Sequence, residues 1–254
     1  MGGHEGVLGD ALNELERVEA QAIREAVVLG GGRGELVGGA SCVAHPIPIP
    51  ELNRAQPVGA HVDVGAVSAW FGTHPHIVNV APEHAHLEDE LSRRGYTRGY
   101  AWMKFERDAT PPAPAETDLR VEETLAADAF GLVTAEGFGI PPEVNSAMTA
   151  IVGAPGWSVF VAYEGDEPAG CGALYCDGAV GWLGIGATRP QFRRRGAQNA
   201  ILAARIVRAG ELGASRVTTE TGVLDESRPN GSYRNILRAG FREAYVRDNW
   251  LSPR

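Results

Sequence analysis

The spacing of apolar residues predicts helices and strands on both sides of a proline-rich stretch. Apolar residues recur at helical spacing from Leu12 to Ile23, which predicts an amphipathic helix over Asp10–Leu29. The glycine-rich residues 1–9 are expected to lie outside it. The elements expected next are a strand at 35–45, a helix at 64–71, a strand at 76–80, a helix at 83–94 and a strand at 96–105.

Residues 108–116 interrupt this pattern, because three of the four residues from Pro111 to Pro114 are prolines. Such composition favours an extended, semi-rigid spacer over a helix or a central strand. We therefore predict a first domain at 1–107, a linker at 108–116 and a second domain at 117–254.

Beyond the linker, strands and helices alternate more regularly. The expected elements are a strand at 118–122, helices at 123–136 and 143–152, strands at 157–163, 169–175 and 180–187, a helix from 196 to 212, a strand at 217–221, a helix at 232–239 and a strand at 241–251. Gly165–Glu167 is expected to join two strands as a hairpin, and Gly213 to cap the long helix.

The segment Thr188–Arg205 joins a predicted buried strand to a helix through a basic turn. Pro190 cannot donate a hydrogen bond to a strand ladder, so we expect the strand to end there. The first amides of the following helix attract anions. Gly196 leaves room for a ligand near the backbone, and Arg193–Arg195 add positive charge. These features favour a pyrophosphate site; a solvated arginine turn at the start of an ordinary helix is the alternative.

The turn carries the pattern Arg193-x-x-Gly196-x-Gln198, which resembles the acetyl-CoA signature of the GNAT acetyltransferases, Gln/Arg-x-x-Gly-x-Gly/Ala. Gln198 departs from the small residue usual in that family. Its side chain either narrows the loop or brings an amide to a phosphate. Asn230–Phe241 also resembles the closing helix and Gly-Phe turn of the family, and the order of elements over 117–254 is similar to the GNAT fold.

This resemblance implies an α/β protein with a mixed sheet, the GNAT acyl-CoA N-acyltransferase fold and acetyl-CoA as co-substrate. It implies cofactor-binding residues on the strand end, the turn and the last helix: Gly186, Ala187, Thr188, Arg193, Arg194, Arg195, Gly196, Ala197, Gln198, Asn199 and Asn235. In the family, a backbone amide of the strand before the turn stabilises the thioester oxygen. Gly184 and Gly186 either mark a bulge that frees such amides or relieve crowding against Trp182.

Two residues are candidates for acid–base chemistry. Glu220 lies on the predicted strand after the cofactor helix, where a carboxylate can take a proton from an ammonium group. Pairing with Arg216 or Arg234 in a structural role is the alternative. The position of the family's usual tyrosine on the last helix is Ile236 here. Tyr233, about one turn earlier, is the candidate acid; alternatively its ring packs and its hydroxyl faces water.

A short segment of the first domain is similar in sequence to a segment of the second. Ser92–Tyr100 aligns with Leu237–Tyr245 at one offset, with their glycines in register. No Arg-x-x-Gly-x-Gly turn precedes residue 110, so we interpret the first domain as a degenerate GNAT-like domain without cofactor. A chance match between two generic helix–glycine–strand turns is the alternative. Pro46–Asn53 and Phe138–Pro142 are expected to wall the acceptor site.

Composition narrows the choice of partners. The 254 residues carry a formal net charge of −9, from 23 Lys and Arg against 32 Asp and Glu, which argues against nucleic-acid or membrane-surface binding. The three cysteines provide neither a disulfide framework nor zinc-ligand spacing, so no metal is expected. Without an apolar run of membrane length or a signal-peptide pattern, the expectation is a soluble cytoplasmic protein.

The sequence therefore predicts an acetyl-CoA-dependent N-acetyltransferase that acts on a primary amine of a small molecule or peptide, by direct attack on the thioester. A homodimer is an open possibility, and the acceptor is not specified. The alternative is a non-catalytic acyl-CoA sensor that keeps the cofactor turn. A nucleotide-phosphate protein is disfavoured, because no Gly-Lys-Ser/Thr follows the loop.

Overall fold

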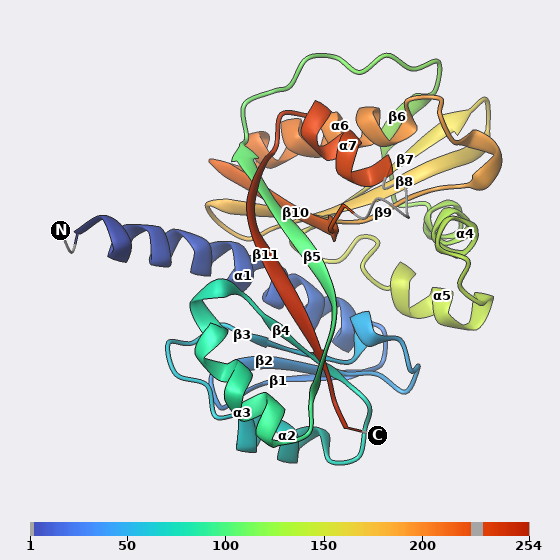
Figure 1. Ribbon diagram of the computed structural model, residues 1–254. Helices are drawn as coiled ribbons and strands as arrows, with labels where there is room; N and C mark the ends of the chain where they lie inside the picture. Colours follow the sequence, from blue (N-terminus) through green and yellow to red (C-terminus); the bar gives the residue numbers. More distant parts are fainter. Residues whose placement is uncertain (1–2, 225–230, 254) are drawn as a thin grey trace. The chain divides into compact units, whose positions relative to one another are not determined.

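The computed structural model describes residues 3–224 and 231–253, and within them the side chains of all but 3–13, 142–144 and 146 (Figure 1). The chain divides into two units: unit 1 holds residues 1–104 and 245–254, and unit 2 holds residues 105–244. Strands β5 (Thr97–Asp108) and β11 (Arg242–Leu251) each supply residues to both units. The last ten residues thus group with unit 1, which differs from the predicted second domain at 117–254. The reason is that the end of β11 pairs with Ile77–Val80 of unit 1.

Unit 1 is a mixed sheet with helices on both faces. Besides β5 and β11, its elements are α1 (Gly3–Leu29), β1 (Arg33–Val37), β2 (Ala40–Ala44), η1 (Pro50–Leu52), β3 (Arg54–Pro57), α2 (Val64–Phe71), β4 (Ile77–Val80), η2 (Pro82–Leu87) and α3 (Glu88–Arg93). Its strand order is β1-β2-β3-β4-β11-β5, with β3 and β4 parallel.

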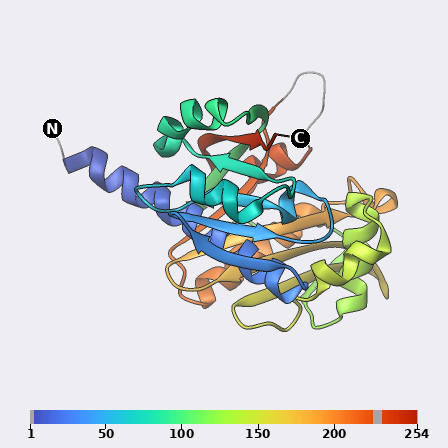
Figure 2. The same cartoon turned by 90° about the horizontal axis from the view of Figure 1, so that it is seen from below.

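Alternation along β2 shows which helix covers each face of the unit 1 sheet. Ala40, Cys42 and Ala44 point into a core with α2 and α3. The Ser41 side chain points the other way and donates to the carbonyl oxygen of Ala20 in α1. Figures 1 and 2 show α1 on one side of the sheet and α2 and α3 on the other. The period of two along a strand therefore separates two packed layers.

A buried ionic cluster lies beneath α1 in unit 1. Glu19 is fully buried and pairs with Arg54 of β3 at 3.1 Å, with Arg247 of β11 at 2.6 Å and with Lys104 of β5. Burial alone would raise the pKa of Glu19, but the charges of Arg247, Lys104 and Arg54 hold that pKa well below its usual value. The cluster links three strands to one helix.

Unit 2 contains the arginine turn. Besides β5 and β11, its elements are β6 (Arg120–Glu123), α4 (Ala127–Phe138), α5 (Pro142–Thr149), β7 (Trp157–Glu164), β8 (Glu167–Cys176), β9 (Val180–Thr188), η3 (Pro190–Phe192), α6 (Ala197–Glu211), β10 (Arg216–Gly222) and α7 (Gly231–Arg238). Its strand order is β11-β5-β10-β9-β8-β7-β6, with β9 and β10 parallel. α6 packs on one face of β6–β9 and α4 on the other (Figure 1).

Most predicted elements are present, and the exceptions have physical reasons. The single strand predicted at 35–45 is a hairpin, because Gly38 and Gly39 both take positive φ, at 53° and 84°. β3 was not predicted, because its Arg54 and Gln56 face the buried ionic cluster and break the hydrophobic pattern. The helix predicted at 83–94 is divided into η2 and α3, and α1 begins seven residues before the predicted Asp10.

The two units share an order of elements. In unit 1, β3 leads through α2 to a parallel β4, then through α3 to β5. In unit 2, β9 leads through α6 to a parallel β10, then through α7 to β11. The turns before β5 and β11 are made by Gly95 and Gly240, each at φ 84°. This is the order that the internal match predicts; the common origin of the two halves stays a prediction.

Candidate functional site

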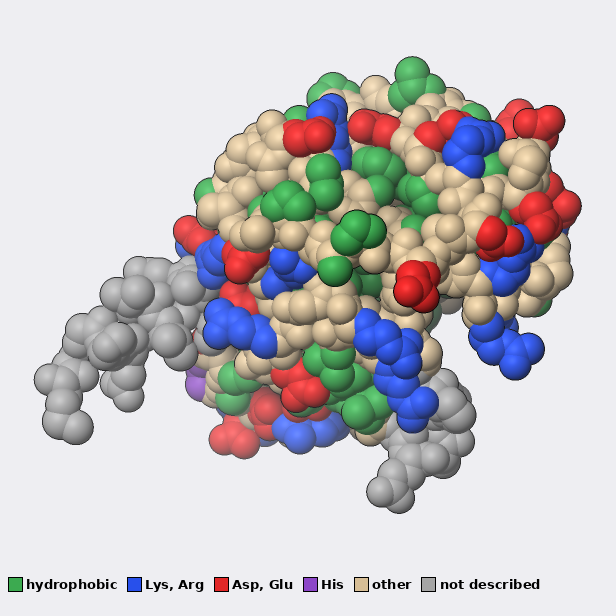
Figure 3. Space-filling model, turned by 90° about the horizontal axis from the view of Figure 1, so that it is seen from above, with side chains coloured by type: hydrophobic (Ala, Val, Ile, Leu, Met, Phe, Trp, Pro, Cys, Tyr) green, Lys and Arg blue, Asp and Glu red, His purple; other side chains and the backbone are tan. Residues whose placement is uncertain are grey.

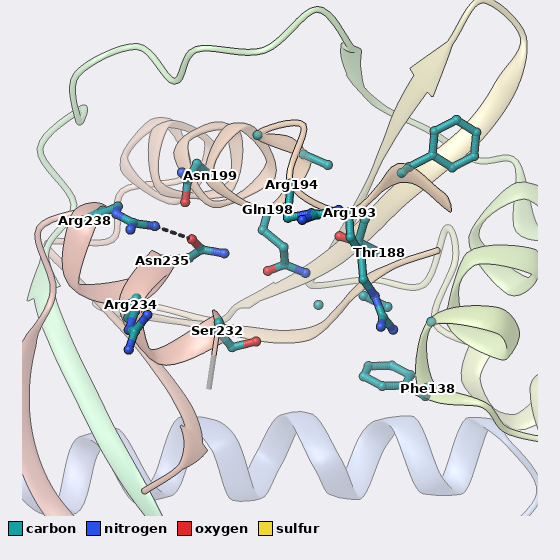
Figure 4. Close-up of a pocket in the computed structure, with 17 residues that line it drawn as sticks. Phe138, Thr188, Arg193, Arg194, Gln198, Asn199, Ser232, Arg234, Asn235 and Arg238 are labelled. Atoms are coloured by element: carbon teal, nitrogen blue, oxygen red, sulfur yellow. Dashed lines mark hydrogen bonds between the residues drawn. The ribbon is translucent and has the colours of Figure 1, made fainter. Parts of the chain in front are cut away.

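A cavity of about 910 Å³ opens in unit 2 at the end of the arginine turn. Its walls come from the last residues of β9, the turn, the first residues of α6, the C-terminal end of α4 and one side of α7. Figure 4 shows Gln198 extending from α6 into this cavity, with Phe138 of α4 and Asn235 of α7 on other walls. The cavity therefore lies where the sequence analysis places the cofactor.

The backbone of the turn leaves amides free at the start of α6. Arg194 has φ 66° and Gly196 has φ 82°, so two residues in left-handed conformation reverse the chain before the helix begins. The first helical hydrogen bond runs from the Ala200 amide to the carbonyl oxygen of the N-cap residue, Gly196, at 3.0 Å. The amides of Ala197, Gln198 and Asn199 precede that bond and have no intrahelical acceptor, which makes this end of α6 a site for anions.

The three arginines of the turn take different roles. Arg193 and Arg194 line the cavity. Arg195 does not; it pairs with Glu164 at 2.7 Å and with Asp118, and its guanidinium lies over the Phe192 ring. Of the eleven residues expected to bind the cofactor, Arg195 is the one outside the cavity wall, and it anchors the turn to the sheet.

Gly196 is required by the chain packed against it, in addition to the role expected for it beside a ligand. A Cβ at this position would collide with the Glu116 carbonyl oxygen and lie 3.1 Å from the Thr117 side chain. The Thr117 hydroxyl donates to the Arg195 carbonyl oxygen at 2.8 Å, which holds the two segments together. Glycine at 196 thus admits the chain at 116–117, and its positive φ sets the turn. Gly196 also lines the cavity, and the expectation that it makes room for a ligand stays a prediction.

Two buried polar atoms of the cavity wall have no hydrogen-bond partner among the described residues. The Thr188 hydroxyl and the Asn199 side-chain oxygen are buried without a hydrogen-bond partner among the described residues. The Gln198 amide lies 3.6 Å from where a Cβ on Gly186 would be, so it faces the end of β9. Asn235 accepts a hydrogen bond from Arg238 at 3.1 Å (Figure 4). Buried polar atoms are rarely left unpaired, so the wall is suited to a polar ligand.

A bulge interrupts β9 next to the cavity. Cys171 of β8 is opposite Ala187 and Ala173 is opposite Gly184, so Gly172 faces the two residues between them. One of these, Ile185, has φ 51°. A Cβ on Gly184 would collide with the Trp182 ring. The strand therefore bulges at 185–186, as the first reading expects, and Gly184 makes room for the indole, as the second expects of it; that the bulge frees amides for the thioester oxygen stays a prediction.

Comparison with known proteins was made by sequence and by structure. No protein-family model matches the chain, and no curated protein matches it. Among solved structures, a GCN5-related N-acetyltransferase from Kribbella flavida aligns with a TM-score of 0.67 at 15% identity, over 94% of this chain and 96% of that one. The chain has the GNAT fold.

Two further solved structures extend this likeness. A GCN5-related N-acetyltransferase from Sphaerobacter thermophilus aligns with a TM-score of 0.62 at 15% identity, over 86% of this chain and 81% of that one. A tandem GNAT protein from the clavulanic acid biosynthesis pathway aligns with a TM-score of 0.54 at 16% identity, over 85% of this chain and 78% of that one. The predicted α/β fold class, GNAT in tandem, is thereby confirmed.

Glu220 lies on β10 in this GNAT fold, outside the cavity wall. The Trp182 indole N–H donates to both of its carboxylate oxygens, at 3.0 and 3.2 Å. Arg216, one of the partners considered for it, lies 3.5 Å from Glu106. Glu220 is thus held beside the place where β9 and β10 stop pairing at Trp182 and Thr218. Its role as a base stays a prediction.

Tyr233 points away from the cavity. Its ring is buried edge-on against Phe105, with 4.8 Å between centroids, and its hydroxyl donates to Glu243 at 2.5 Å. Burial, followed by the bond to Glu243, raises the pKa of Tyr233 to about 12. The ring packs as one reading proposed, but the hydroxyl bonds a carboxylate rather than water. Ile236 is also buried. Asp225 and Glu226, expected to face solvent, lie outside the described residues.

Some wall residues were not predicted. Arg234 and Arg238 are one turn apart on α7 and both line the cavity; their i, i+4 spacing was the available signal. Phe192 and Ser232 were also missed. Phe138, expected to wall the acceptor site, lines this cavity, and its contact with an acceptor stays a prediction. Among the described wall residues, arginine supplies every formal charge, in a protein whose net charge is −9. That local excess favours an anionic ligand.

In unit 1, the helix that matches α6 starts differently. The Asp63 side chain caps α2 and accepts a hydrogen bond from the Ala66 amide at 2.9 Å. The protein's own carboxylate thus takes the place of an external anion at this helix end. This supports the interpretation that the first half does not bind cofactor.

Other classes of site find little support in the described residues. No group of three or more His, Cys, Asp or Glu there is placed to hold a metal ion. Within the same residues, no helix has both the length and the apolar character needed to cross a membrane. On the face drawn in Figure 3, basic and acidic side chains are intermixed.

Proposed function

We propose that the protein is an acetyl-CoA-dependent N-acetyltransferase whose acceptor is a primary amine of a small molecule or peptide. The observation that carries the proposal is the cavity at the start of α6. Free helix amides, Arg193 and Arg194 meet there with the unpaired Asn199 oxygen. The amides and guanidinium groups suit the phosphates of acetyl-CoA. The Asn199 oxygen is an acceptor and suits an N–H group, such as an amide of the pantetheine arm.

The chemistry assigns work to few side chains. When bound, acetyl-CoA supplies a thioester whose carbonyl carbon bonds to the amine nitrogen while the carbon–sulfur bond breaks. Backbone amides at Gly186–Thr188 would stabilise negative charge on the thioester oxygen. Glu220 would take the proton that the ammonium group loses, directly or through water. The pKa of the thiol that leaves is far below that of an alcohol or an amine. The thiolate can therefore depart unprotonated and take its proton from water, so it needs no tyrosine beside it.

A second function is favoured by one observation. The described cavity wall contains no carboxylate, histidine, cysteine or tyrosine, so proton transfer relies on groups behind it. A non-catalytic module that binds acyl-CoA would have such a wall. A cytoplasmic location and a homodimer are further expectations attached to both functions.

Binding of acetyl-CoA is tested by titration calorimetry on a matched pair of arginine variants. Arg193 lines the cavity and Arg195 does not, although the two are neighbours on one turn. We expect Arg193→Ala to weaken acetyl-CoA binding about 10-fold, since a charge-assisted contact to phosphate contributes roughly 1.5 kcal/mol. Arg195→Ala should weaken it less than Arg193→Ala does, because Arg195 only anchors the turn through Glu164 and Asp118. Equal binding by both variants and the parent would remove the basis of the proposal.

Enzyme and binding module are separated by a thiol-release assay over small amines, antibiotics and peptides. Release of CoA that depends on an added amine supports the enzyme. A parent protein that binds acetyl-CoA tightly yet acetylates no amine in a broad panel supports the module.

A further inference from the structure

A buried arginine lies directly behind the bulge of β9. Arg205, on the sheet-facing side of α6, is 2% exposed. Its Nη1 donates to the Gly184 carbonyl oxygen at 2.9 Å and to the Ala173 carbonyl oxygen at 3.0 Å. These two residues are the opposed pair that borders the bulge. One guanidinium nitrogen therefore connects β8 and β9 at the point where their register slips.

The glycines around the bulge are shaped to this side chain. A Cβ on Gly172, the residue opposite the bulge, would lie 2.7 Å from the Arg205 Cζ. A Cβ on Gly186 would lie 3.7 Å from its Nη2. Gly186 also lines the cavity, so the guanidinium lies next to a residue of the candidate site.

The charge of Arg205 is unusual for its position. Among the described residues, no carboxylate forms an ion pair with it, and its hydrogen-bond partners there are all backbone carbonyls. Buried charges in proteins are normally paired, because removing a guanidinium from water is costly. An apolar residue of similar volume would fill the same space without that cost. This points to a role beyond packing.

The bulge itself requires support. Ile185 is a β-branched residue at φ 51°, a conformation that such residues rarely adopt. The extra residue of a bulge also leaves backbone groups unpaired, and strained backbone persists only where the surroundings enforce it. The bonds from Arg205 to the flanking carbonyls are positioned to do so.

We propose that Arg205 is a positioning residue for acyl transfer: it fixes the β9 bulge so that the Gly186–Ala187 backbone faces the cavity. The inference rests on the proposed function, because it assumes that this backbone meets the acyl group. Arg205 is not among the residues that line the cavity, and it acts through Gly184 and Gly186.

Three variants and one control test it in the full-length protein. Arg205→Met keeps side-chain volume and removes every donor, and Arg205→Lys keeps the charge. Gly172→Ala keeps the arginine but places a methyl group against its Cζ. Arg208→Met is the matched control, because Arg208 lies one turn later on α6 and pairs with Glu123 and Glu211 at the surface.

Two readouts distinguish positioning from general stability. Since misplacing a reacting group by about 1 Å can cost about 100-fold, we expect Arg205→Met to lower kcat about 100-fold and Gly172→Ala to lower it as well. Arg205→Lys should restore part of the loss. The dissociation constant for CoA, which lacks the acyl group, should change less than about 2-fold, because the α6 turn is untouched.

Hydrogen–deuterium exchange supplies a readout independent of activity. Amides of 184–187 should exchange faster in Arg205→Met and Gly172→Ala, while those of the α6 turn and the Arg208→Met control stay as in the parent. Unchanged exchange at the bulge would overturn the proposal, as would losses of kcat and CoA affinity in equal measure. If the parent binds no acetyl-CoA, the proposed function fails; the exchange data still decide whether Arg205 holds the bulge.

Discussion

At the scale of single residues, the contact between Glu220 and Trp182 is the clearest lead to proton transfer. The indole N–H bonds both carboxylate oxygens, which fixes the orientation of the group. An amine acceptor is mostly protonated at neutral pH, so an N-acetyltransferase needs such a group.

We expect Glu220→Gln to lower turnover strongly, by about 100-fold, because the variant cannot accept a proton. Its affinity for acetyl-CoA should stay close to that of the parent. The parent's rate should rise with pH through one ionisation that the variant lacks, which a pH–rate profile of thiol release measures. Trp182→Phe is the companion variant: it removes the indole donor together with part of the buried ring volume. Parent-like turnover in Glu220→Gln would dismiss this residue as the base.

Tyr233 should prove structural. Its hydroxyl is bonded to Glu243 and it is not among the residues of the cavity wall, so Tyr233→Phe removes that hydrogen bond and leaves the buried ring in place. We expect a loss of about 1 kcal/mol in the free energy of unfolding, measured in urea. Turnover should stay within about 2-fold of the parent. A large fall in turnover with unchanged stability would return Tyr233 to the role of acid.

At the scale of an element, the start of α6 depends on one glycine more than on the arginines around it. Gly196 and Gly213 flank α6 and both have positive φ, at 82° and 92°. They differ in surroundings: a Cβ on Gly213 meets nothing within 4 Å, whereas one on Gly196 meets the Glu116 carbonyl. Substituting Gly213 therefore tests the effect of backbone strain alone, and substituting Gly196 tests strain together with a steric clash.

We expect Gly213→Ala to destabilise the protein by about 1 kcal/mol, the usual effect of left-handed conformation on a residue with a Cβ. Gly196→Ala should destabilise it by roughly 3 kcal/mol, because the chain at 116–117 must also move. Urea unfolding of both variants gives the comparison. If both variants lost the same free energy of unfolding, the segment at 116–117 would move at no energetic cost and only the positive φ would matter.

At the scale of the whole molecule, strands β5 and β11 make the two sequence halves interdependent. Each strand contributes residues to both units, so neither residues 1–107 nor residues 117–254 contain all the strands of one unit. Within unit 1, Lys104 of β5 and Arg247 of β11 meet at Glu19 of α1. This cluster connects α1 of unit 1 to its two long strands, β5 and β11.

Replacing Glu19 by Gln should destabilise unit 1 by roughly 3–5 kcal/mol, since buried cations lose their counter-ion. Glu14→Gln, an exposed position on the same helix, is the control and should have little effect. Because the pKa of Glu19 in the fold lies well below 4.5, its contribution is present above pH 4.5 and is lost as the pH falls below it. Urea unfolding at pH 7 and pH 3.5 should show this loss in the parent and not in Glu19→Gln. A variant as stable as the parent at pH 7 would contradict the account.

Local patterns in the sequence determined much of the fold. Periodicity predicted α2 at Val64–Phe71 with the bounds it has, and the glycines of unit 2 predicted the cap of α6 and the bulge of β9. Ten of the eleven residues that the family resemblance implies for the cofactor line one cavity, and their binding of it stays a prediction. These features depend on residues within about one turn or strand of each other, so neighbouring letters carry the signal.

Only the tertiary structure decided the remainder. That Arg195 pairs with Glu164 rather than facing the cavity, and that Arg205 is buried behind Gly186, follows from which strands lie side by side. β3 escaped prediction because Arg54 and Gln56 are polar in sequence and buried by partners far along the chain. The sequence alone does not show whether a charged residue is exposed at the surface or buried in the core. Its role depends on the groups that long-range pairing brings to it, and no local pattern records them.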